Sequence, residues 1–311
     1  MATSCTGPKP SSRHSAEGFT LLEMLIAMTV AGILLSLALA LSLSSRGVYQ
    51  LDQGRTSLNQ TLRNALDIIG SDVRQAGEEL PANFPAIVAV DGGVNPDTLV
   101  LRINKLTEVL TACAAVNAGA SQVLIRDSAA AIPCDPTDLD GNGLPDSAER
   151  WVSYRAGAAV KAFIFSPATC QGEFIIYSGE QPGATQSYLT ISGVDGNYPQ
   201  GSSLYILSQR TYQLVAGDLQ LAVDQGNFQN LAAGVGDFQI RVDLVDDKGT
   251  PLDSSDDSEV VQNGFDQCGS SFDWADVAWL ELTLSGSTQV GQQNVDRQVS
   301  AQFFPRNVFS N

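Results

Sequence analysis

Oxygen-bearing side chains recur at short intervals in DLDGNGLPDSAE, which runs from Asp138 to Glu149. The stretch fits D-x-[DN]-x-[DN]-G-x5-E at every fixed position, and Gly143 stands where such a loop needs a sharp turn. The expected side-chain oxygen ligands are Asp138, Asp140 and Asn142, and Leu144 is expected to contribute its backbone carbonyl. Asp146 would bind directly or through water, and Glu149 would bind through both carboxylate oxygens. Close carboxylates repel unless a cation neutralises them, so the spacing predicts a calcium site.

The alternative for this loop is a solvated acidic turn. The residues before it do not form an amphipathic helix, so the loop is not half of a paired EF-hand. It is more similar to the isolated calcium loops of extracellular domains. A second acidic stretch, Asp246–Glu259, lacks ligand spacing and is interpreted as a solvated loop.

Catalytic chemistry has little support in this chain. His14, in the polar N-terminal tail, is the single histidine, which excludes catalysis by a Ser-His-Asp or Cys-His group and zinc sites built on histidine. No C-x-x-C pair occurs. We therefore expect a protein that is not an enzyme.

Four cysteines follow the N-terminal apolar segment, and Cys5 precedes it. In a domain beyond a membrane the four predict two disulfides, for which three connectivities exist. The favoured pairing is Cys113–Cys134, which closes a short local loop, with Cys170–Cys268, which links a central strand to the C-terminal sheet.

Phe19–Leu43 is an apolar segment with one charged residue, Glu23. As a helix it would rise about 37 Å, enough to cross a bilayer. Lys9 and Arg13 place its N-terminal side in the cytoplasm. A plain signal anchor would explain the length but not Glu23, because a carboxylate in hydrocarbon is costly and usually functional.

The stretch EGFTLLEMLIA around Glu23 resembles the class III signal of the type IV pilin superfamily. The resemblance implies that a prepilin peptidase cleaves between Gly18 and Phe19 and that the new N-terminal Phe19 is methylated. It also implies that Glu23 faces the amine of Phe19 in a neighbouring subunit of a fibre, where the ion pair would offset the burial of both charges.

Periodicity predicts an α+β fold. Apolar residues at gaps of three, four or seven extend one long helix from Thr20 to Gln75, and the pattern then changes to period two. The expected parts are a leader (1–18), a membrane or fibre-core helix (19–43), its amphipathic continuation (44–77) and a β-rich domain (78–311) with a calcium-loop insertion near 113–150. The domain is expected to pack a mostly antiparallel sheet on the helix, as in the lollipop shape of pilins. The candidate strands are Ala86–Val90, Thr98–Asn104, Gln122–Arg126, Trp151–Tyr154, Ala162–Phe165, Phe174–Tyr177, Tyr188–Ile191, Ser203–Ser208, Tyr212–Val215, Leu219–Val223, Asp237–Leu244, Ala278–Ser285 and Gln298–Phe304.

Short stretches at both ends of the domain resemble PilW-type minor pilins: DVRQAG (Asp72–Gly77), NLAAGVGDFQIRVDL (Asn230–Leu244), VAWLELTLSGST (Val277–Thr288) and the terminal FFPRNVFSN. The middle of the domain carries no such likeness. Many major pilins also have a proline midway along the N-terminal helix, whereas none occurs here between Pro10 and Pro81.

This resemblance implies a minor pilin that primes, caps or enters a type IV pilus. Its partners would be the prepilin peptidase/methyltransferase, other major and minor pilins and the inner-membrane assembly platform. It would be a single-pass precursor in the bacterial inner membrane, with its domain in the periplasm, and then part of a surface fibre. The alternatives are a J-type pseudopilin of a type II secretion system and a calcium-dependent tip adhesin or DNA-uptake component. A net charge of −17 disfavours direct nucleic-acid binding.

Overall fold

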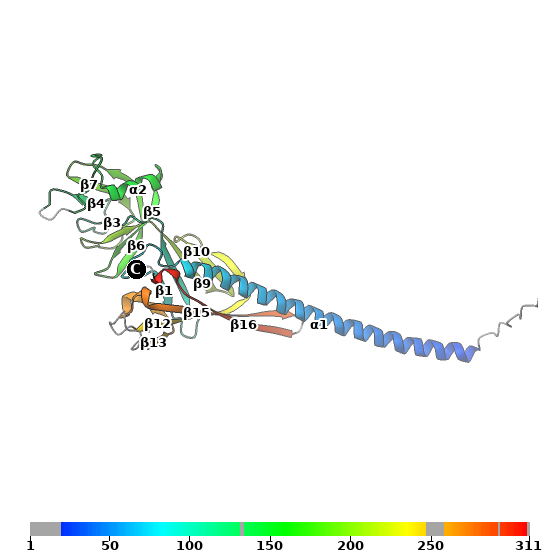
Figure 1. Ribbon diagram of the computed structural model, residues 1–311. Helices are drawn as coiled ribbons and strands as arrows, with labels where there is room; N and C mark the ends of the chain where they lie inside the picture. Colours follow the sequence, from blue (N-terminus) through cyan, green and yellow to red (C-terminus); the bar gives the residue numbers. More distant parts are fainter. Residues whose placement is uncertain (1–19, 131–133, 247–257, 292, 310–311) are drawn as a thin grey trace, which may run out of the picture. The chain divides into compact units, whose positions relative to one another are not determined.

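A computed structural model describes residues 20–130, 134–246, 258–291 and 293–309 (Figure 1). The chain divides into two compact units, residues 1–53 and 54–311, and helix α1 (Leu21–Gln75) contributes to both.

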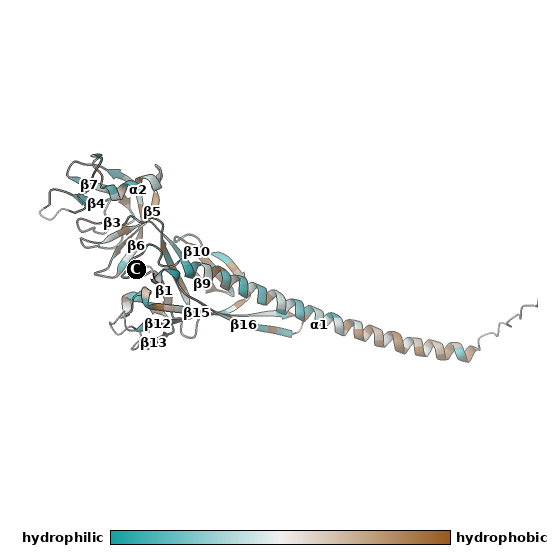
Figure 2. Ribbon diagram, in the orientation of Figure 1, coloured by the Kyte–Doolittle hydropathy of each residue, from teal (hydrophilic) through white to brown (hydrophobic). Residues whose placement is uncertain are grey.

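In the first unit, α1 presents an almost wholly apolar surface as far as Leu43 (Figure 2). Its large side chains are exposed, from Leu21 at 81% to Leu43 at 59%. The hydroxyls of Thr29 and Ser36 donate to the carbonyls of Ile26 and Ile33, both at 2.8 Å, so these polar groups are satisfied within the helix. By length and composition the helix could cross a membrane.

In the second unit, the rest of α1 is amphipathic. Its buried stripe recurs at helical spacing and consists of Leu58, Leu62, Ala65, Leu66, Ile69 and Val73. Burial of each larger member contributes about 1.5–3 kcal/mol. The helix stops before Gly77, whose φ of 79° suits a left-handed helix end and whose N–H bonds to the carbonyl of Arg102. The predicted helix, Thr20–Gln75, is thus confirmed.

Three sheets make up the rest of this unit, and every strand pairing among the described residues is antiparallel. The first sheet has the order β11-β10-β9-β2-β1-β14. Its strands are β1 (Ile87–Val90), β2 (Thr98–Asn104), β9 (Leu207–Val215), β10 (Asp218–Val223), β11 (Gln229–Ala233) and β14 (Phe265–Asp266).

The second sheet has the order β13-β12-β15-β16 and the third the order β3-β8-β5-β6-β7-β4. The second contains β12 (Val235–Asp246), β13 (Ser258–Gln262), β15 (Val277–Val290) and β16 (Gln293–Phe303). The third contains β3 (Leu110–Thr111), β4 (Gln122–Asp127), β5 (Val160–Ser166), β6 (Gln171–Gln181), β7 (Gln186–Ser192) and β8 (Ser203–Tyr205). Short helices complete the unit: α2 (Asp146–Arg155), η1 (Gln267–Gly269), η2 (Trp274–Asp276) and η3 (Arg306–Phe309). The predicted α+β class is confirmed.

Two hydrophobic cores share strand β5. The first core contains the buried stripe of α1 and residues of the first two sheets, while the second lies between the third sheet and α2. Along β5, Phe163 and Phe165 belong to the first core, and Ala162 and Ile164 belong to the second. Because successive residues of a strand face opposite sides, β5 is buried on both faces and joins the cores.

One strand prediction was wrong, and a second was wrong in part. Trp151–Tyr154 lies inside α2, where Ala148 and Trp151 are buried one helical turn apart. Ser203–Ser208 was predicted as one strand, but the ladder breaks at Ile206. The residues before the break pair in the third sheet and those after it pair in the first.

Candidate functional site

The start of α1 carries the predicted processing signal. Gly18 and Phe19 lie outside the described residues, and Glu23 lies in the first turn of the helix. The N–H and hydroxyl of Thr20 donate to Glu23 Oε2, both at 3.4 Å, and the N–H of Glu23 donates to Thr20 Oγ1 at 3.3 Å. These long, reciprocal bonds form a capping box. T-x-x-E is the standard sequence signature of such a box, yet the box was not among the features predicted from the sequence.

The loop Asp138–Glu149 precedes α2, and its last residues form the first turn of that helix. Asp138 Oδ2 accepts the N–H of Gly143 at 3.1 Å, and Gly143 has a φ of 86°. Asp146 Oδ1 accepts the N–H of Leu139 at 3.0 Å. The predicted ligands therefore lie in one closed turn and in the first turn of the helix that follows it.

The side chains of this loop are linked through Asn142. Its Nδ2 donates to Asp140 Oδ2 at 2.9 Å and to Glu149 Oε1 at 3.1 Å, and its Oδ1 accepts the N–H of Leu144 at 2.8 Å. Among the residues that the structure describes, no three His, Cys, Asp or Glu side chains already surround one point as metal ligands. The calcium assignment thus stays a prediction.

Arg126 is a partner of the loop that sequence reasoning missed. It lies on β4, and its Nη2 is 3.3 Å from Asp138 Oδ2, with both side chains 8% exposed. Its Nη1 donates to the carbonyl of Gly183 at 3.0 Å. Nothing in the local sequence connects Arg126 to Asp138, because the contact depends on the pairing of β4 with β7.

Helix α2 is tied to the third sheet at its other end. Arg155 donates to both oxygens of Glu180 on β6, at 2.8 and 2.9 Å, and Tyr177 donates to Oε1 of the same carboxylate. Burial raises the pKa of Glu180, but these donors outweigh it and leave the pKa below its usual value. The pair holds the helix that carries Glu149.

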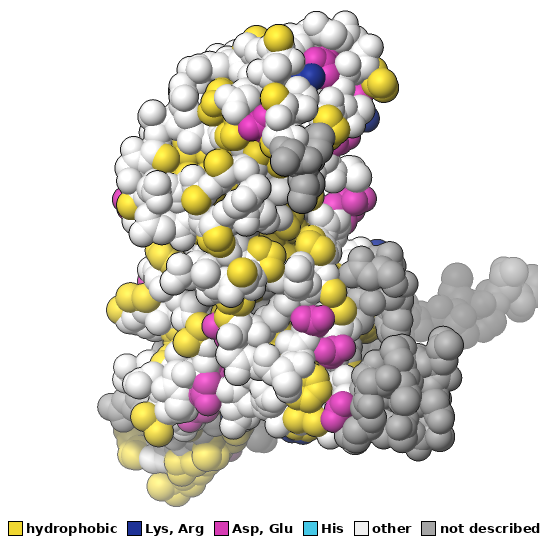
Figure 3. Space-filling model, turned by 90° about the vertical axis from the view of Figure 1, so that its left-hand side faces the viewer, with side chains coloured by type: hydrophobic (Ala, Val, Ile, Leu, Met, Phe, Trp, Pro, Cys, Tyr) yellow, Lys and Arg dark blue, Asp and Glu magenta, His cyan; other side chains and the backbone are white. Residues whose placement is uncertain are grey.

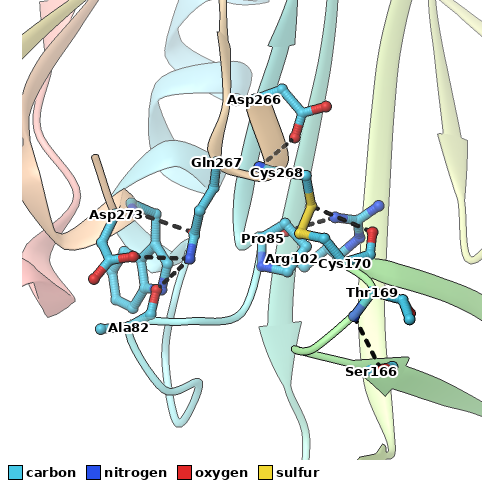
Figure 4. The surroundings of a disulfide bond; sticks show 11 residues. Ala82, Pro85, Arg102, Ser166, Thr169, Cys170, Asp266, Gln267, Cys268 and Asp273 are labelled. Atoms are coloured by element: carbon cyan, nitrogen blue, oxygen red, sulfur yellow. Dashed lines mark hydrogen bonds between the residues drawn. A yellow bond between two sulfur atoms is a disulfide. The ribbon is translucent and has the colours of Figure 1, made fainter. Parts of the chain in front are cut away.

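Disulfides Cys113–Cys134 and Cys170–Cys268 are present, and both pairs are those favoured from the sequence. Cys134 begins the segment that leads into the loop. Figure 4 shows Cys170, from the turn between β5 and β6, joined to Cys268 in η1. The second bond therefore links the third sheet to the segment that follows β14 in the first.

Residues 13–39 match the family model of the prokaryotic N-terminal methylation motif. No curated protein and no solved structure matches the chain. The match covers the predicted cleavage site and most of the apolar segment, and it supports a class III signal of the type found in type IV pilins. It indicates a pilin or pseudopilin, with a membrane-anchored precursor, processing by a prepilin peptidase and assembly with other pilins.

Most of Asp246–Glu259 lies outside the described residues, and only its ends, in β12 and β13, are placed.

Beyond the motif, segments from both ends of the domain meet at the C-terminal end of α1. Arg74 lies over the ring of Phe303, 5.3 Å from its centroid. A Cβ on Gly77 would lie 2.2 Å from the ring of Trp274, so only glycine fits there. Asn307 Nδ2 donates to the carbonyls of Gln75 and Ala76, both at 3.3 Å. The RQAG and FFPRN stretches are thus parts of one packed helix end.

Proposed function

We propose that this chain is a structural minor pilin of the PilW type, which primes, caps or enters a type IV pilus after cleavage at Gly18 and methylation of Phe19. The observation that carries the proposal is the methylation motif over residues 13–39 on an exposed apolar helix. The helix continues into the core of a β-rich unit, where its buried stripe packs.

Helix α1 suits a subunit that is held by its N-terminal half. In a precursor the apolar surface would lie in the inner membrane, with the β-rich unit in the periplasm. In a fibre the same surface would be buried against neighbouring helices. The hydroxyls of Thr29 and Ser36 bond within the helix, so either setting leaves few polar groups unsatisfied.

A PilW-type role is favoured by the packed helix end. The segments that resemble PilW-type pilins are distant in sequence, yet Arg74, Gly77, Phe303 and Asn307 meet at one place. Such contacts give these segments a shared structural task. The absence of proline between Pro10 and Pro81 suits a subunit other than the bulk component of a fibre.

The role is non-enzymatic and does not include direct nucleic-acid binding. Figure 3 shows one face of the molecule, on which acidic side chains are scattered and basic ones are few. This agrees with the net charge of −17, which would repel a phosphate backbone. Partners are the prepilin peptidase/methyltransferase, the assembly platform and other pilins.

The test is the mass and N-terminus of the protein recovered from sheared surface fibres. The proposal expects a chain that begins at methylated Phe19. A fibre fraction that lacks the protein, or that holds it with residues 1–18 attached, would contradict it.

A J-type pseudopilin of a type II secretion system is the second candidate, since the methylation motif serves both classes. Deletion of the gene separates them. Loss of surface pili with normal protein secretion supports the minor pilin, whereas loss of secretion with normal pili supports the pseudopilin. A tip adhesin that depends on calcium is a third candidate, and it requires a cation at the loop Asp138–Glu149.

A further inference from the structure

The loop Asp138–Glu149 is not used by the proposed assembly role, yet it is held firmly in the β-rich unit. The carbonyl of Gly143 accepts the N–H of Gly183 at 3.0 Å and the hydroxyl of Ser187 on β7. The N–H of Asp146 donates to the carbonyl of Thr137 at 3.1 Å, which closes the base of the loop. The turn is therefore fixed against the third sheet.

One carboxylate oxygen of this loop is buried without a partner. The side chain of Asp138 is 8% exposed, and its Oδ2 accepts the N–H of Gly143 and lies 3.3 Å from Nη2 of Arg126. Its other oxygen, Oδ1, is buried and has no hydrogen-bond partner. Because Oδ2 bonds to the central Gly143, the carboxylate faces the inside of the turn. A buried acceptor that lacks a donor is unfavourable unless something else binds it.

Asp140 and Glu149 are brought together by a hydrogen-bond donor. The amide nitrogen of Asn142 lies about 3 Å from an oxygen of each. A cation with oxygen ligands at 2.3–2.6 Å would need these two carboxylates only slightly closer. The N–H₂ group thus lies where two ligands of the predicted set converge.

We propose that this loop binds one calcium ion, through Asp138 Oδ1, Asp140, Asn142 Oδ1, the Leu144 carbonyl and a bidentate Glu149. The Asn142 amide turns over on binding, so that Oδ1 replaces Nδ2 between the two carboxylates. Asp146, which accepts the Leu139 N–H, acts through a water molecule. The ion satisfies the orphan oxygen of Asp138, which the present hydrogen bonds leave without a partner.

The ligand set selects calcium over other common cations. All the ligands are oxygens, and neither histidine nor a free cysteine is among them, which disfavours zinc. The loop carries four carboxylates, of which Asp138 alone is shown paired with Arg126, so a divalent ion would balance the remaining negative charge. A site with this many oxygens suits calcium, because calcium accepts six to eight oxygen ligands in variable geometry, whereas magnesium demands six in a small octahedron.

The test uses the full chain in detergent micelles, stripped with EGTA and titrated with calcium chloride by calorimetry. We expect one site with a Kd of about 10⁻⁴–10⁻³ M, as in extracellular modules. At 5 mM calcium the melting temperature should rise by about 3–8 °C relative to chelator. Magnesium chloride should give less than half of that shift. The measurement needs no fibre, so its result is independent of the pilin assignment.

Variants of the proposed ligands test where the calcium ion binds. Asp140→Asn and Glu149→Gln should each weaken binding at least tenfold while preserving the melting temperature in chelator within about 2 °C. Asn142→Asp should tighten binding several-fold, because it adds an anionic oxygen and removes the competing amide donor. In chelator it should melt lower than the parent, because the bridge between Asp140 and Glu149 is lost.

Leu139→Ala, in the same loop with an 87% exposed side chain that is not a ligand, is the matched control and should bind like the parent. The proposal is overturned if the parent shows neither calcium heat nor a melting shift at 5 mM. It is also overturned if Glu149→Gln binds as tightly as the parent.

Discussion

Asn307 closes the C-terminal end of α1. Its side-chain amide donates to the carbonyls of Gln75 and Ala76, 3.3 Å from each, across more than two hundred residues of sequence. The last carbonyls of a helix have no partner within it, so a donor from elsewhere satisfies them and lies favourably at the negative end of the helix dipole.

Removal of this donor should destabilise the protein. Asn307→Ala should lower the free energy of unfolding by about 0.5–1.5 kcal/mol, as expected for the loss of a hydrogen bond. Asn307→Asp should cost more, because a carboxylate would face carbonyl oxygens. Chemical unfolding of the parent and variants measures both. Asn294→Ala, which removes an exposed contact within β16, should change stability by less than 0.5 kcal/mol.

Processing should depend on Gly18. Gly18→Ala or a bulkier residue should leave the precursor uncut in the membrane, because the resemblance places the peptidase cut directly after this glycine. Immunoblots of membrane fractions with and without the peptidase read the size change. Normal cleavage of a Gly18→Leu variant would refute the assignment of the site.

The charge of Glu23 can be separated from its helix cap. Glutamine also serves in a capping box, so Glu23→Gln keeps the bonds with Thr20 but removes the charge. If an ion pair with the neighbouring amine drives assembly, Glu23→Gln and Glu23→Ala should both leave the membrane level normal and reduce the amount in sheared fibres at least tenfold. Fibre entry of the glutamine variant at the parental level would show that the cap, and not the charge, is what assembly requires.

The Arg155–Glu180 pair should make stability depend on pH. The folded-state pKa of Glu180 is lowered, so its contribution is complete above the unfolded value of about 4.3 and is lost as the pH falls through the folded pKa. At pH 7, Glu180→Gln should lower the free energy of unfolding by about 1.5–3 kcal/mol, as expected for the loss of a hydrogen bond to a charged group. Urea unfolding between pH 3 and pH 7 should show the difference from the parent shrinking only in the acid range. Glu259→Gln, which changes an exposed carboxylate, is the control. A difference in stability between the Glu180→Gln variant and the parent that stays constant across this pH range would contradict the link between the Glu180 pKa and stability.

The two disulfides should contribute unequally. They close loops of 21 and 98 residues, for which a chain-entropy estimate is about 3 and about 5 kcal/mol. The double substitution Cys170→Ser with Cys268→Ser should therefore destabilise the protein by at least 1 kcal/mol more than Cys113→Ser with Cys134→Ser. Unfolding midpoints under non-reducing conditions test this, with peptide mapping to establish the pairing. Equal losses would show that chain entropy does not govern the difference.

The long helix was predictable because its signals are local. The apolar stripe from Leu58 to Val73 repeats at helical spacing, and Gly77 ends it, so α1 could be bounded almost to the residue. The oxygen spacing of Asp138–Glu149 is local as well, and the structure forms a closed turn there.

The strands were harder to predict, because neither a period-two pattern nor a short apolar run specifies which strand a segment pairs with. Trp151–Tyr154 was predicted as a strand, yet these residues lie in α2. The Trp151 side chain is buried there, and its indole N–H donates to the carbonyl of Glu108. Ser203–Ser208 has a single alternating pattern, but Ile206 separates residues that pair with β5 from residues that pair with β2.

By itself the sequence determined the processing signal, the long helix, the α+β class and the spacing of the candidate ligands, since each depends on residues close together in the chain. The tertiary structure decided which distant groups meet: Arg126 with Asp138, Asn307 with the end of α1, and the two faces of β5 with two different cores. Such contacts depend on strand pairing and on the packing of a whole core. Their stability is shared among many residues, so no single stretch of the chain encodes them.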